Sequence, residues 1–252
     1  MTADGPSPCA TDTTGTPEEE WARWPGLDRV PSVDLGGVRE VVVVAPHPDD
    51  ETLGFGGGLA VLAARGVRLR VVAVTDGESS HPDSSVFTRE QLVARRAAER
   101  ARALAALGAG GAEVERLRLP DGGVAGREPE LVRRLARAYR DSDLCVAPWE
   151  GDPHPDHEAV GRAARDAAQA LGVRLLSYPV WAWHWTRPGD GALPWGRAVR
   201  LGLAGEALRR KAAAIRAFTT QVSPIGPDAA DRAILEPPML AHFARDHEVV
   251  FT

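Results

Sequence analysis

Residues 41–58 read VVVVAPHPDDETLGFGGG, and this stretch decides the fold class. Its four consecutive valines, Val41–Val44, are typical of a strand buried on both faces of a parallel sheet. Open α/β sheets bind their ligands at the carboxyl ends of such strands. The segment His47–Glu51 carries an imidazole and three acids, so it predicts a catalytic metal site at this edge.

The turn that follows this strand is expected to be stiff. Pro48 fixes its own φ and biases His47 toward extended backbone. His47 and Asp50, three positions apart, can then reach one ion, which leaves Asp49 free for proton transfer. The segment also fits a simpler interpretation, a strand-to-helix loop in which an aspartate caps the helix.

A second polar segment, residues 151–158, reads GDPHPDHE and follows the apolar stretch Leu144–Pro148. Apolar positions then recur at 160, 163, 164, 167, 168 and 171, which predicts a helix with Asp156 as N-cap and His157 in its first turn. Each histidine taken singly also fits a loop residue. Because a His-Pro-Asp unit stands at two strand ends, two histidines and one carboxylate can form an open zinc site that keeps a position for water.

The two segments together carry a family resemblance. APHPDDETLGFGG at 45–57 and GDPHPDHEAVGRAA at 151–164 resemble the paired signature of the LmbE/PIG-L family of zinc-dependent N-deacetylases, which act on N-acetylglucosamine-type substrates and related amides. Shorter matches extend the resemblance over most of the chain from Val38 to Phe251, namely VTDGE at 74–78, RRAAERARALAALG at 95–108, LPDGG at 119–123 and KAAAIRAFTTQ at 211–221.

The resemblance implies a role for each matched residue. It implies three zinc ligands, namely His47, Asp50 and His157. Asp49 would be the general base, and His154 would support the oxyanion or protonate the leaving amine. Asp156 would orient His154. One carboxylate could in principle perform both proton transfers, so the division of labour between Asp49 and His154 stays open.

Other matched positions concern the substrate. Arg96 and Asp121 match positions that contact substrate hydroxyls in relatives, although a helical arginine also fits solvated surface. Some relatives carry an aromatic hydroxyl two positions before the histidine that matches His154, where this chain has Asp152. The resemblance therefore gives no tyrosine for the oxyanion hole.

An aromatic segment, WAWHW at 181–185, precedes a loop rich in glycine and proline. It predicts a wall or lid in which Trp183 and His184 contact the substrate, but it also fits a packed loop or a contact within a homo-oligomer. The segment DGESSHPDSSVFT at 76–88 is a second lid candidate. Its own His81–Asp83 unit follows no apolar strand and is interpreted as a turn, not as a set of ligands.

Alternating strand and helix patterns predict an α/β fold, a Rossmann-like three-layer sandwich with a mainly parallel sheet. Residues 1–36, rich in Thr, Pro, Gly and acids, are expected to form a largely disordered extension, and 37–252 the single catalytic domain. The expected elements are strands near 41–45, 67–74, 113–118, 143–147 and 173–178, and helices near 56–65, 89–107, 128–139 and 157–171.

Composition narrows the class of protein. The 252 residues are 44% hydrophobic and 26% charged, which suits a chain with a substantial core. A net charge of −5 argues against a nucleic-acid binder. Two cysteines give no disulfide framework, and neither a membrane span nor a signal peptide is expected, which favours a cytoplasmic protein with a small-molecule N-acetylated amino-sugar substrate.

Three other functions compete with this prediction. A dinucleotide-binding protein would need a third small residue after Gly54 and Gly56, at the position of Leu59. Acidic residues at this place would also repel phosphate. A catalytically idle sugar-binding relative would not need the complete set of histidines and aspartates. An amidase that acts on a thiol-sugar conjugate remains a close alternative, because the sequence does not select the acyl acceptor.

Overall fold

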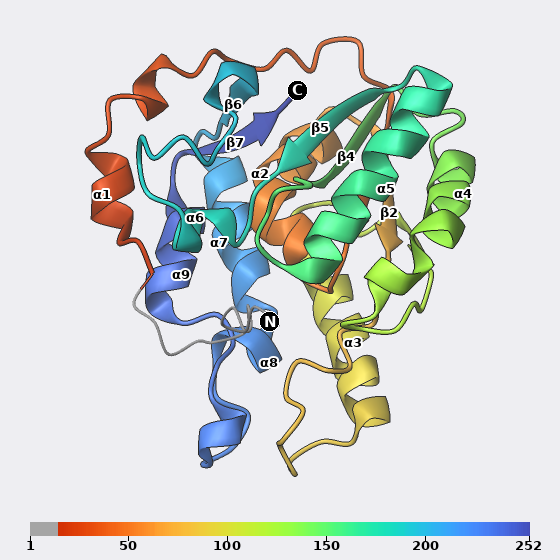
Figure 1. The fold of residues 1–252 in the computed structure, drawn as a ribbon, viewed down its shortest axis with the longest axis vertical. Coiled ribbons are helices and arrows are strands. Elements are labelled where there is room, and N and C mark those ends of the chain that lie inside the picture. The colour runs from red at the N-terminus through yellow and green to blue at the C-terminus, as the bar shows by residue number, and fades with distance from the viewer. Residues whose placement is uncertain (1–14) are drawn as a thin grey trace, which may run out of the picture.

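The computed structural model describes residues 15–252, which form one sheet between two layers of helices (Figure 1). The strands lie in the order β3-β2-β1-β4-β5-β7-β6. The first five are parallel, whereas β7 runs antiparallel to both β5 and β6. Their bounds are β1 Glu40–Ala45, β2 Arg68–Ala73, β3 Glu113–Arg116, β4 Leu144–Pro148, β5 Arg174–Tyr178, β6 Ala198–Gly202 and β7 His247–Phe251. This confirms the predicted fold class, although β6 and β7 were not predicted.

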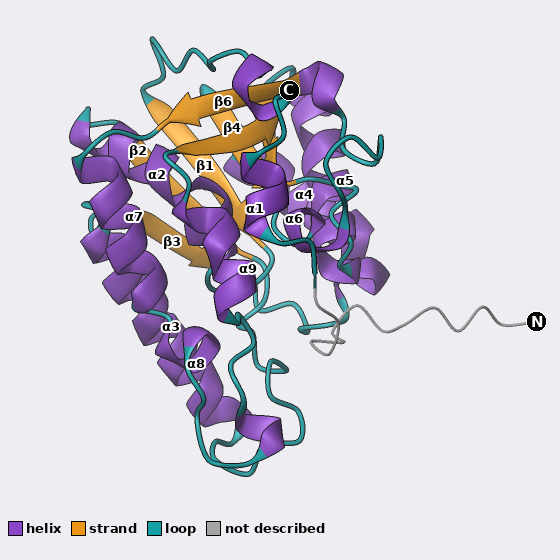
Figure 2. Ribbon diagram, turned by 90° about the vertical axis from the view of Figure 1, so that its left-hand side faces the viewer, coloured by secondary structure: helices purple, strands orange, loops and turns teal. Residues whose placement is uncertain are grey.

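The helices cover both faces of the sheet. Figure 2 shows α2, α3 and α7 on one side of the strands and α4 and α5 on the other. The α-helix bounds are α1 Glu18–Ala22, α2 Asp50–Ala64, α3 Arg89–Ala106, α4 Glu128–Ala138, α5 Pro155–Leu171, α6 Ala182–Trp185, α7 Glu206–Arg216, α8 Thr219–Val222 and α9 Pro237–Ala241. Across residues 15–252, no helix is both long and apolar enough to cross a bilayer.

The valines of β1 explain the two layers. Side chains alternate along a strand, so Val41 and Val43 enter one hydrophobic core while Val42 and Val44 enter the other. All four are fully buried. One side of β1 packs with residues of α2, α3 and α7, and the other side packs with residues of α4 and α5.

The strand order places a crevice between β1 and β4. The chain passes from β1 to β2 and β3 on one side, and then returns to β4 and β5 on the other. Val43 pairs with Val146, so the two strands end side by side. Ligands of open α/β sheets bind at this kind of reversal, beyond the carboxyl ends of the strands. The first His-Pro-Asp segment begins two residues after the end of β1, and the second begins six residues after the end of β4.

The glycine cluster has a structural role inside α2. The helix is kinked at Phe55, where φ is −143° and ψ is 22°. The N–H groups of Gly57 and Gly58 donate to the Glu248 carboxylate over 2.7 Å and 2.9 Å, and Lys211 Nζ lies 2.7 Å from the same carboxylate. The glycine-rich backbone of α2 therefore binds an internal carboxylate, which Lys211 neutralises.

Residues 15–36 differ from the expected disordered extension. Trp21 is fully buried, and its Nε1 donates to the Trp183 carbonyl over 2.9 Å. The Glu18 carboxylate accepts two 2.6 Å hydrogen bonds from Arg245. The composition of this segment lacks an apolar period, and only contacts with distant residues fix it. The expectation for residues 1–14 lies outside the described residues.

The buried pair of Lys211 and Glu248 gives a test of this packing. Lys211→Met should destabilise the fold by about 3–5 kcal/mol, because it leaves the Glu248 charge buried without its cation. Arg209→Met on the same helix should leave stability unchanged, since Arg209 pairs with Glu206 in solvent. Urea unfolding of both variants measures the difference. Equal midpoints would show that the backbone N–H groups alone compensate Glu248.

Candidate metal centre

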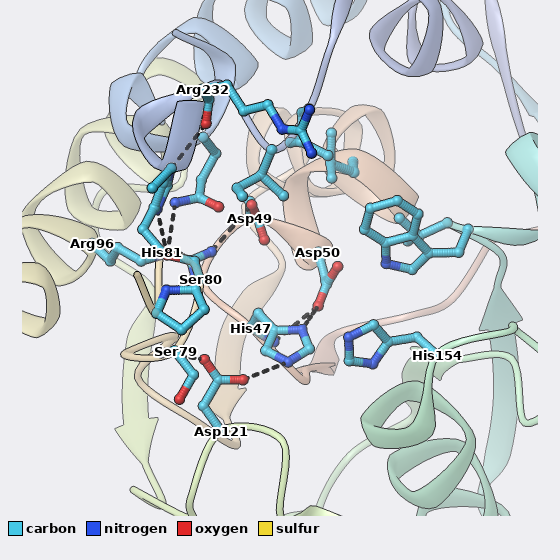
Figure 3. A pocket seen from close by; sticks show the side chains of 18 of the residues that line it. His47, Asp49, Asp50, Ser79, Ser80, His81, Arg96, Asp121, His154 and Arg232 are labelled. Atoms are coloured by element: carbon cyan, nitrogen blue, oxygen red, sulfur yellow. Dashed lines mark hydrogen bonds and ion pairs between the residues drawn. The ribbon is translucent and has the colours of Figure 1, made fainter. Parts of the chain in front are cut away.

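Three predicted ligands meet at the ends of β1 and β4. Asp50 Oδ2 lies 3.2 Å from His47 Nδ1 and 3.2 Å from His157 Nε2. His47, Asp50 and His157 form a group whose donor atoms could hold one metal ion. Figure 3 shows His47 and Asp50 side by side in the cavity. The topology therefore brings together residues more than a hundred positions apart.

The outer nitrogens of both imidazoles are held by other carboxylates. His157 Nδ1 lies 2.7 Å from Asp152 Oδ2, and His47 Nε2 lies 3.2 Å from Asp156 Oδ2. A carboxylate only accepts, so these nitrogens carry protons when the rings are neutral, and the lone pairs point at Asp50. Lone pairs and a carboxylate that face one another need a cation between them. This donor arrangement is the one that metal-binding histidines use.

Without a metal, protons meet this need. Burial alone lowers the pKa of His157, but the carboxylates of Asp50 and Asp152 outweigh it and raise that pKa to about 9. Burial also lowers the pKa of His47, yet its three carboxylate neighbours raise it well above its usual value. The site therefore attracts positive charge, either as protons on the two histidines or as a metal ion.

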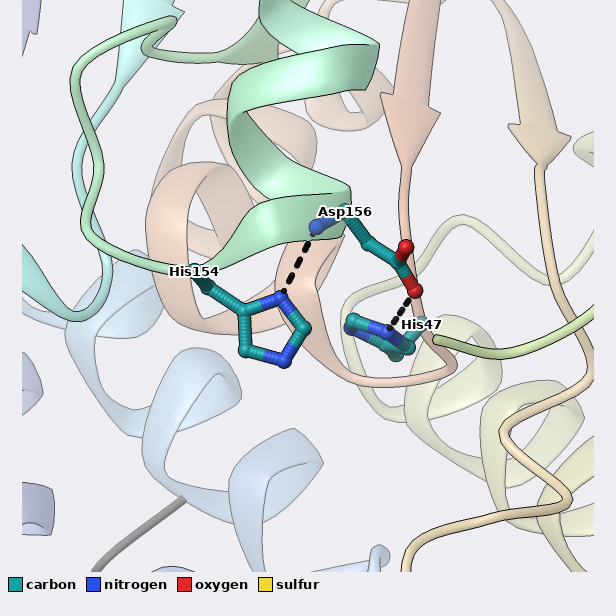
Figure 4. A group of neighbouring side chains, drawn as sticks. All are labelled: His47, His154 and Asp156. Atoms are coloured by element: carbon teal, nitrogen blue, oxygen red, sulfur yellow. Dashed lines mark hydrogen bonds and ion pairs between the residues drawn. The ribbon is translucent and has the colours of Figure 1, made fainter. Parts of the chain in front are cut away.

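A second possible metal group consists of His47, His154 and Asp156 (Figure 4). Its donors are already engaged. The Asp156 carboxylate accepts the N–H groups of Gly122 and Val124 over 2.8 Å and 3.1 Å. His154 Nδ1 accepts the Asp156 N–H over 3.2 Å. This group is therefore the weaker cradle for a metal.

The start of α5 corrects two expectations about Asp156. The N-cap is His154, whose own side chain accepts the hydrogen bond, so the prediction that Asp156 caps this helix is wrong. Pro155 suits the first helical position, and the helix starts two residues earlier than expected. Asp156 meets His154 through its backbone N–H and uses its carboxylate on His47.

The hydrogen bond from the Asp156 N–H to His154 determines which ring nitrogen of His154 carries the proton. Because Nδ1 accepts a backbone N–H, the proton of the neutral ring lies on Nε2. Burial, together with the neighbouring His157 and His47 cations, lowers the pKa of His154 to about 3. His154 is therefore a neutral donor at the cavity wall, beside the metal cradle.

Asp49 is held in a strained backbone conformation. Its φ of 149° lies in a region that favours glycine, and it directly precedes α2. Arg96 is buried and donates to Asp49 Oδ2 over 3.2 Å and to the Pro48 carbonyl over 2.9 Å. Burial outweighs the Arg96 charge and raises the pKa of Asp49 to about 7. Arg96, expected at a substrate hydroxyl, thus positions Asp49 as well as lining the cavity.

The cavity above the cradle has a volume of about 330 Å³. Its polar end carries Asp121, whose Oδ1 lies 3.2 Å from His47 Nε2. The expected contact of Asp121 with a substrate hydroxyl stays a prediction. Trp181 forms part of the wall and stacks near His154, with ring centroids 6.3 Å apart. An apolar part of the wall consists of Leu53, Val180, Ala229, Ala230, Ile234 and Leu235.

Trp183 and His184, the expected substrate contacts, do not line this cavity. Trp183 is 4% exposed and packs edge-on against Trp21 at 5.1 Å, with the Arg245 guanidinium 4.1 Å from its ring. Successive helical positions point in different directions, so Trp181 and Trp183 face opposite sides of this turn. The alternative interpretation of a packed loop therefore holds for Trp183.

Two residues of the site have no role that the sequence pattern indicates. Asp152 stands where some relatives carry a tyrosine, and it is fully buried behind His157. Gln221 lines the cavity and lies in the KAAAIRAFTTQ match, which was its only signal.

His81 lies in a turn, as predicted, and is absent from both metal groups found in residues 15–252. It nevertheless lines the cavity, with Nε2 3.2 Å from the Arg232 carbonyl oxygen.

The fold and the site define a Rossmann-like α/β protein with a His-Asp-His metal cradle at its strand ends. A family model described as PIG-L, GlcNAc-PI de-N-acetylase, matches residues 42–168, just over half of the chain. The chain belongs to this family.

Two curated relatives show how similar this chain is to known members. It is 30% identical to the 1D-myo-inositol 2-acetamido-2-deoxy-alpha-D-glucopyranoside deacetylase of Tsukamurella paurometabola, over 64% of this chain and 66% of the relative. It is 31% identical to a probable N-acetyl-alpha-D-glucosaminyl L-malate deacetylase 2 of Bacillus anthracis, over 53% and 61%. The chain thus spans slightly less than two thirds of the length of these relatives.

Solved structures share the fold. A conserved protein of Thermus thermophilus, TT1542, superposes with a TM-score of 0.56 at 31% identity, covering 75% of this chain and 82% of that one. GalB, a 4-carboxy-2-hydroxymuconate hydratase of Pseudomonas putida, superposes with the same TM-score at 20% identity, covering 73% and 80%. Because the names of these fold relatives include a hydratase, the fold alone does not define the reaction.

The cradle predicts which substitutions remove a metal. Asp50→Ala and His157→Ala should each lower the amount of Zn²⁺ that stays bound after gel filtration, because each removes one of three donors. His184→Ala, which removes an imidazole outside both metal groups, should bind Zn²⁺ like the unaltered protein. Elemental analysis provides the measurement. Full zinc content in either of the first two variants would exclude that residue as a ligand.

Proposed function

We propose that this protein is a zinc-dependent hydrolase that removes the acetyl group from the amide nitrogen of an N-acetylglucosamine-type substrate. The observation that carries the proposal is the cradle of His47, Asp50 and His157 beside the buried carboxylate of Asp49, in one cavity. Two imidazoles and one carboxylate suit a zinc ion that keeps a position for water. A carboxylate held beside that position suits a general base.

The substrate class rests on what the relatives share. The names of both relatives describe an acetylated glucosamine unit, joined to myo-inositol in one and to L-malate in the other. The amide is the common part, and the group joined to the sugar varies. In this chain the amide would meet the polar end of the cavity. The joined group would lie along the apolar wall that includes Trp181 and Leu235.

Proton transfer is assigned to Asp49. Zinc in the cradle would polarise the amide carbonyl and lower the pKa of a bound water to about 7. Asp49 then takes a proton from the attacking water as its oxygen bonds to the carbonyl carbon. The same proton passes to the amine nitrogen as the C–N bond breaks. Arg96 keeps the Asp49 carboxylate in place through both transfers.

His154 is assigned to the carbonyl oxygen. Its Nε2–H can donate to this oxygen as negative charge develops, because Nδ1 is engaged with the Asp156 N–H. The neutral ring suffices for this role, so a protonated His154 is not required. Asp49 alone then performs the proton transfers, and His154 stabilises the tetrahedral stage.

Asp49→Asn separates base from ligand. The amide keeps the size of the side chain but cannot take a proton, so kcat should fall by about two to four orders of magnitude. Zinc content should stay at the level of the unaltered protein. Acetate release from an N-acetylglucosamine conjugate and elemental analysis give the two values. Loss of zinc would show that Asp49 is a ligand, and unchanged kcat would remove it from the mechanism.

The two tryptophans should respond differently to substitution. Trp181→Ala should raise KM while the free energy of unfolding changes little, because Trp181 lines the cavity wall. Trp183→Ala should cost about 3–5 kcal/mol of stability, since it removes a buried ring from the core. Kinetics and urea unfolding on both variants check this pair. A KM effect confined to Trp183→Ala would restore the original expectation for that residue.

A further inference from the structure

Asp152 connects two parts of the site that the chain places far apart. It is fully buried in the loop between β4 and α5. Its Oδ1 accepts the N–H groups of Val180 and Ala182 over 3.1 Å and 2.7 Å. Its Oδ2 accepts the Trp181 N–H over 3.1 Å and lies 2.7 Å from His157 Nδ1.

These contacts use both oxygens of the carboxylate. An ionised carboxylate only accepts hydrogen bonds, so His157 Nδ1 donates to Asp152, as the three backbone N–H groups do. In the neutral ring the lone pair therefore lies on Nε2, toward Asp50, and this is the tautomer that a metal requires. The same carboxylate holds the backbone of Trp181, whose ring lines the cavity. One buried charge thus fixes a metal donor and a wall of the cavity.

We propose that Asp152 is a positioning residue that holds His157 in its metal-binding tautomer and couples metal loading to the placement of the Trp181 wall. The inference rests on the proposed metal site, but it concerns a residue outside the ligand set. A metal bound at Nε2 fixes the orientation of the His157 ring that Asp152 holds, and the N–H groups of residues 180–182 share that carboxylate.

Asp152→Asn distinguishes positioning from packing. If the amide oxygen stays with Val180 and Ala182, the new NH₂ group faces two groups at once. It donates to His157 Nδ1, which moves the ring proton to Nε2, toward the metal position. It also opposes the Trp181 N–H, donor against donor. The substitution preserves the volume of the side chain but reverses the direction of its hydrogen bond with His157 Nδ1.

The experiment measures Zn²⁺ affinity by competition with a chromophoric chelator. Asp152→Asn should bind Zn²⁺ about 10–100-fold more weakly than the unaltered protein, the range found when such supporting groups are lost. Asp190→Asn is the matched control. Asp190 also accepts two backbone N–H groups, from Arg187 and Ala192, and it lies outside both metal groups found in residues 15–252. Its variant should keep full affinity.

A second measurement needs no variant. Hydrogen exchange of the N–H groups of residues 180–182 should slow at least several-fold when Zn²⁺ is added to the metal-free protein. Equal zinc affinity of Asp152→Asn and the unaltered protein would overturn the positioning role. Unchanged exchange in this segment would overturn the coupling. If the unaltered protein failed to bind Zn²⁺, the proposed metal centre itself would fall, so the two failures are distinguishable.

Discussion

Compensation of buried negative charge at the ends of β1 and β4 is the constraint on which the rest of this structure depends. Isolated buried carboxylates are costly, so each needs a partner of opposite charge or a set of hydrogen-bond donors. Here the partners are specific. Arg96 holds Asp49, Arg100 lies 3.5 Å from Glu51, and backbone N–H groups hold Asp152 and Asp156. What remains is the Asp50 carboxylate between two imidazoles, where a cation completes the balance.

The same electrostatic solution occurs a second time, at the glycine-rich part of α2. Glu248 accepts two helix N–H groups there and is neutralised by Lys211. In a nucleotide-binding protein of similar topology, the phosphate binds at the helix N-terminus that directly follows the first strand. Here that position carries Asp49 and Asp50, and the N–H groups that bind a carboxylate are those of Gly57 and Gly58, further along the helix. The crevice between β1 and β4 is left for the metal cradle, which sets the chemistry where the fold does not.

The sequence predicts poorly the position of residues whose role depends on a single long-range contact. Arg96 fits an exposed helical arginine in sequence, yet it is buried against Asp49 because α3 packs close to the turn after β1. Trp183 and Trp181 are equivalent in composition, and only the direction of one short turn sends Trp183 to the core and Trp181 to the cavity. Trp21 similarly fixes a segment that looks unstructured by composition. None of these outcomes has a periodic signal, so no pattern could predict them.

The sequence by itself determined the five parallel strands, the helices that alternate with them and the reactive residues. Four valines specify a strand buried on both faces, and the two His-Pro-Asp segments supply histidines and aspartates with the chemistry of metal ligands, because strand periodicity and ligand chemistry are local properties. Tertiary structure alone decided which carboxylate holds which histidine and which backbone segment. The Asp152 contact with His157, and with it the link to the Trp181 backbone, depends on where β4, α5 and β5 pack. Hydrogen bonds select partners by geometry in space, and sequence spacing does not encode that geometry.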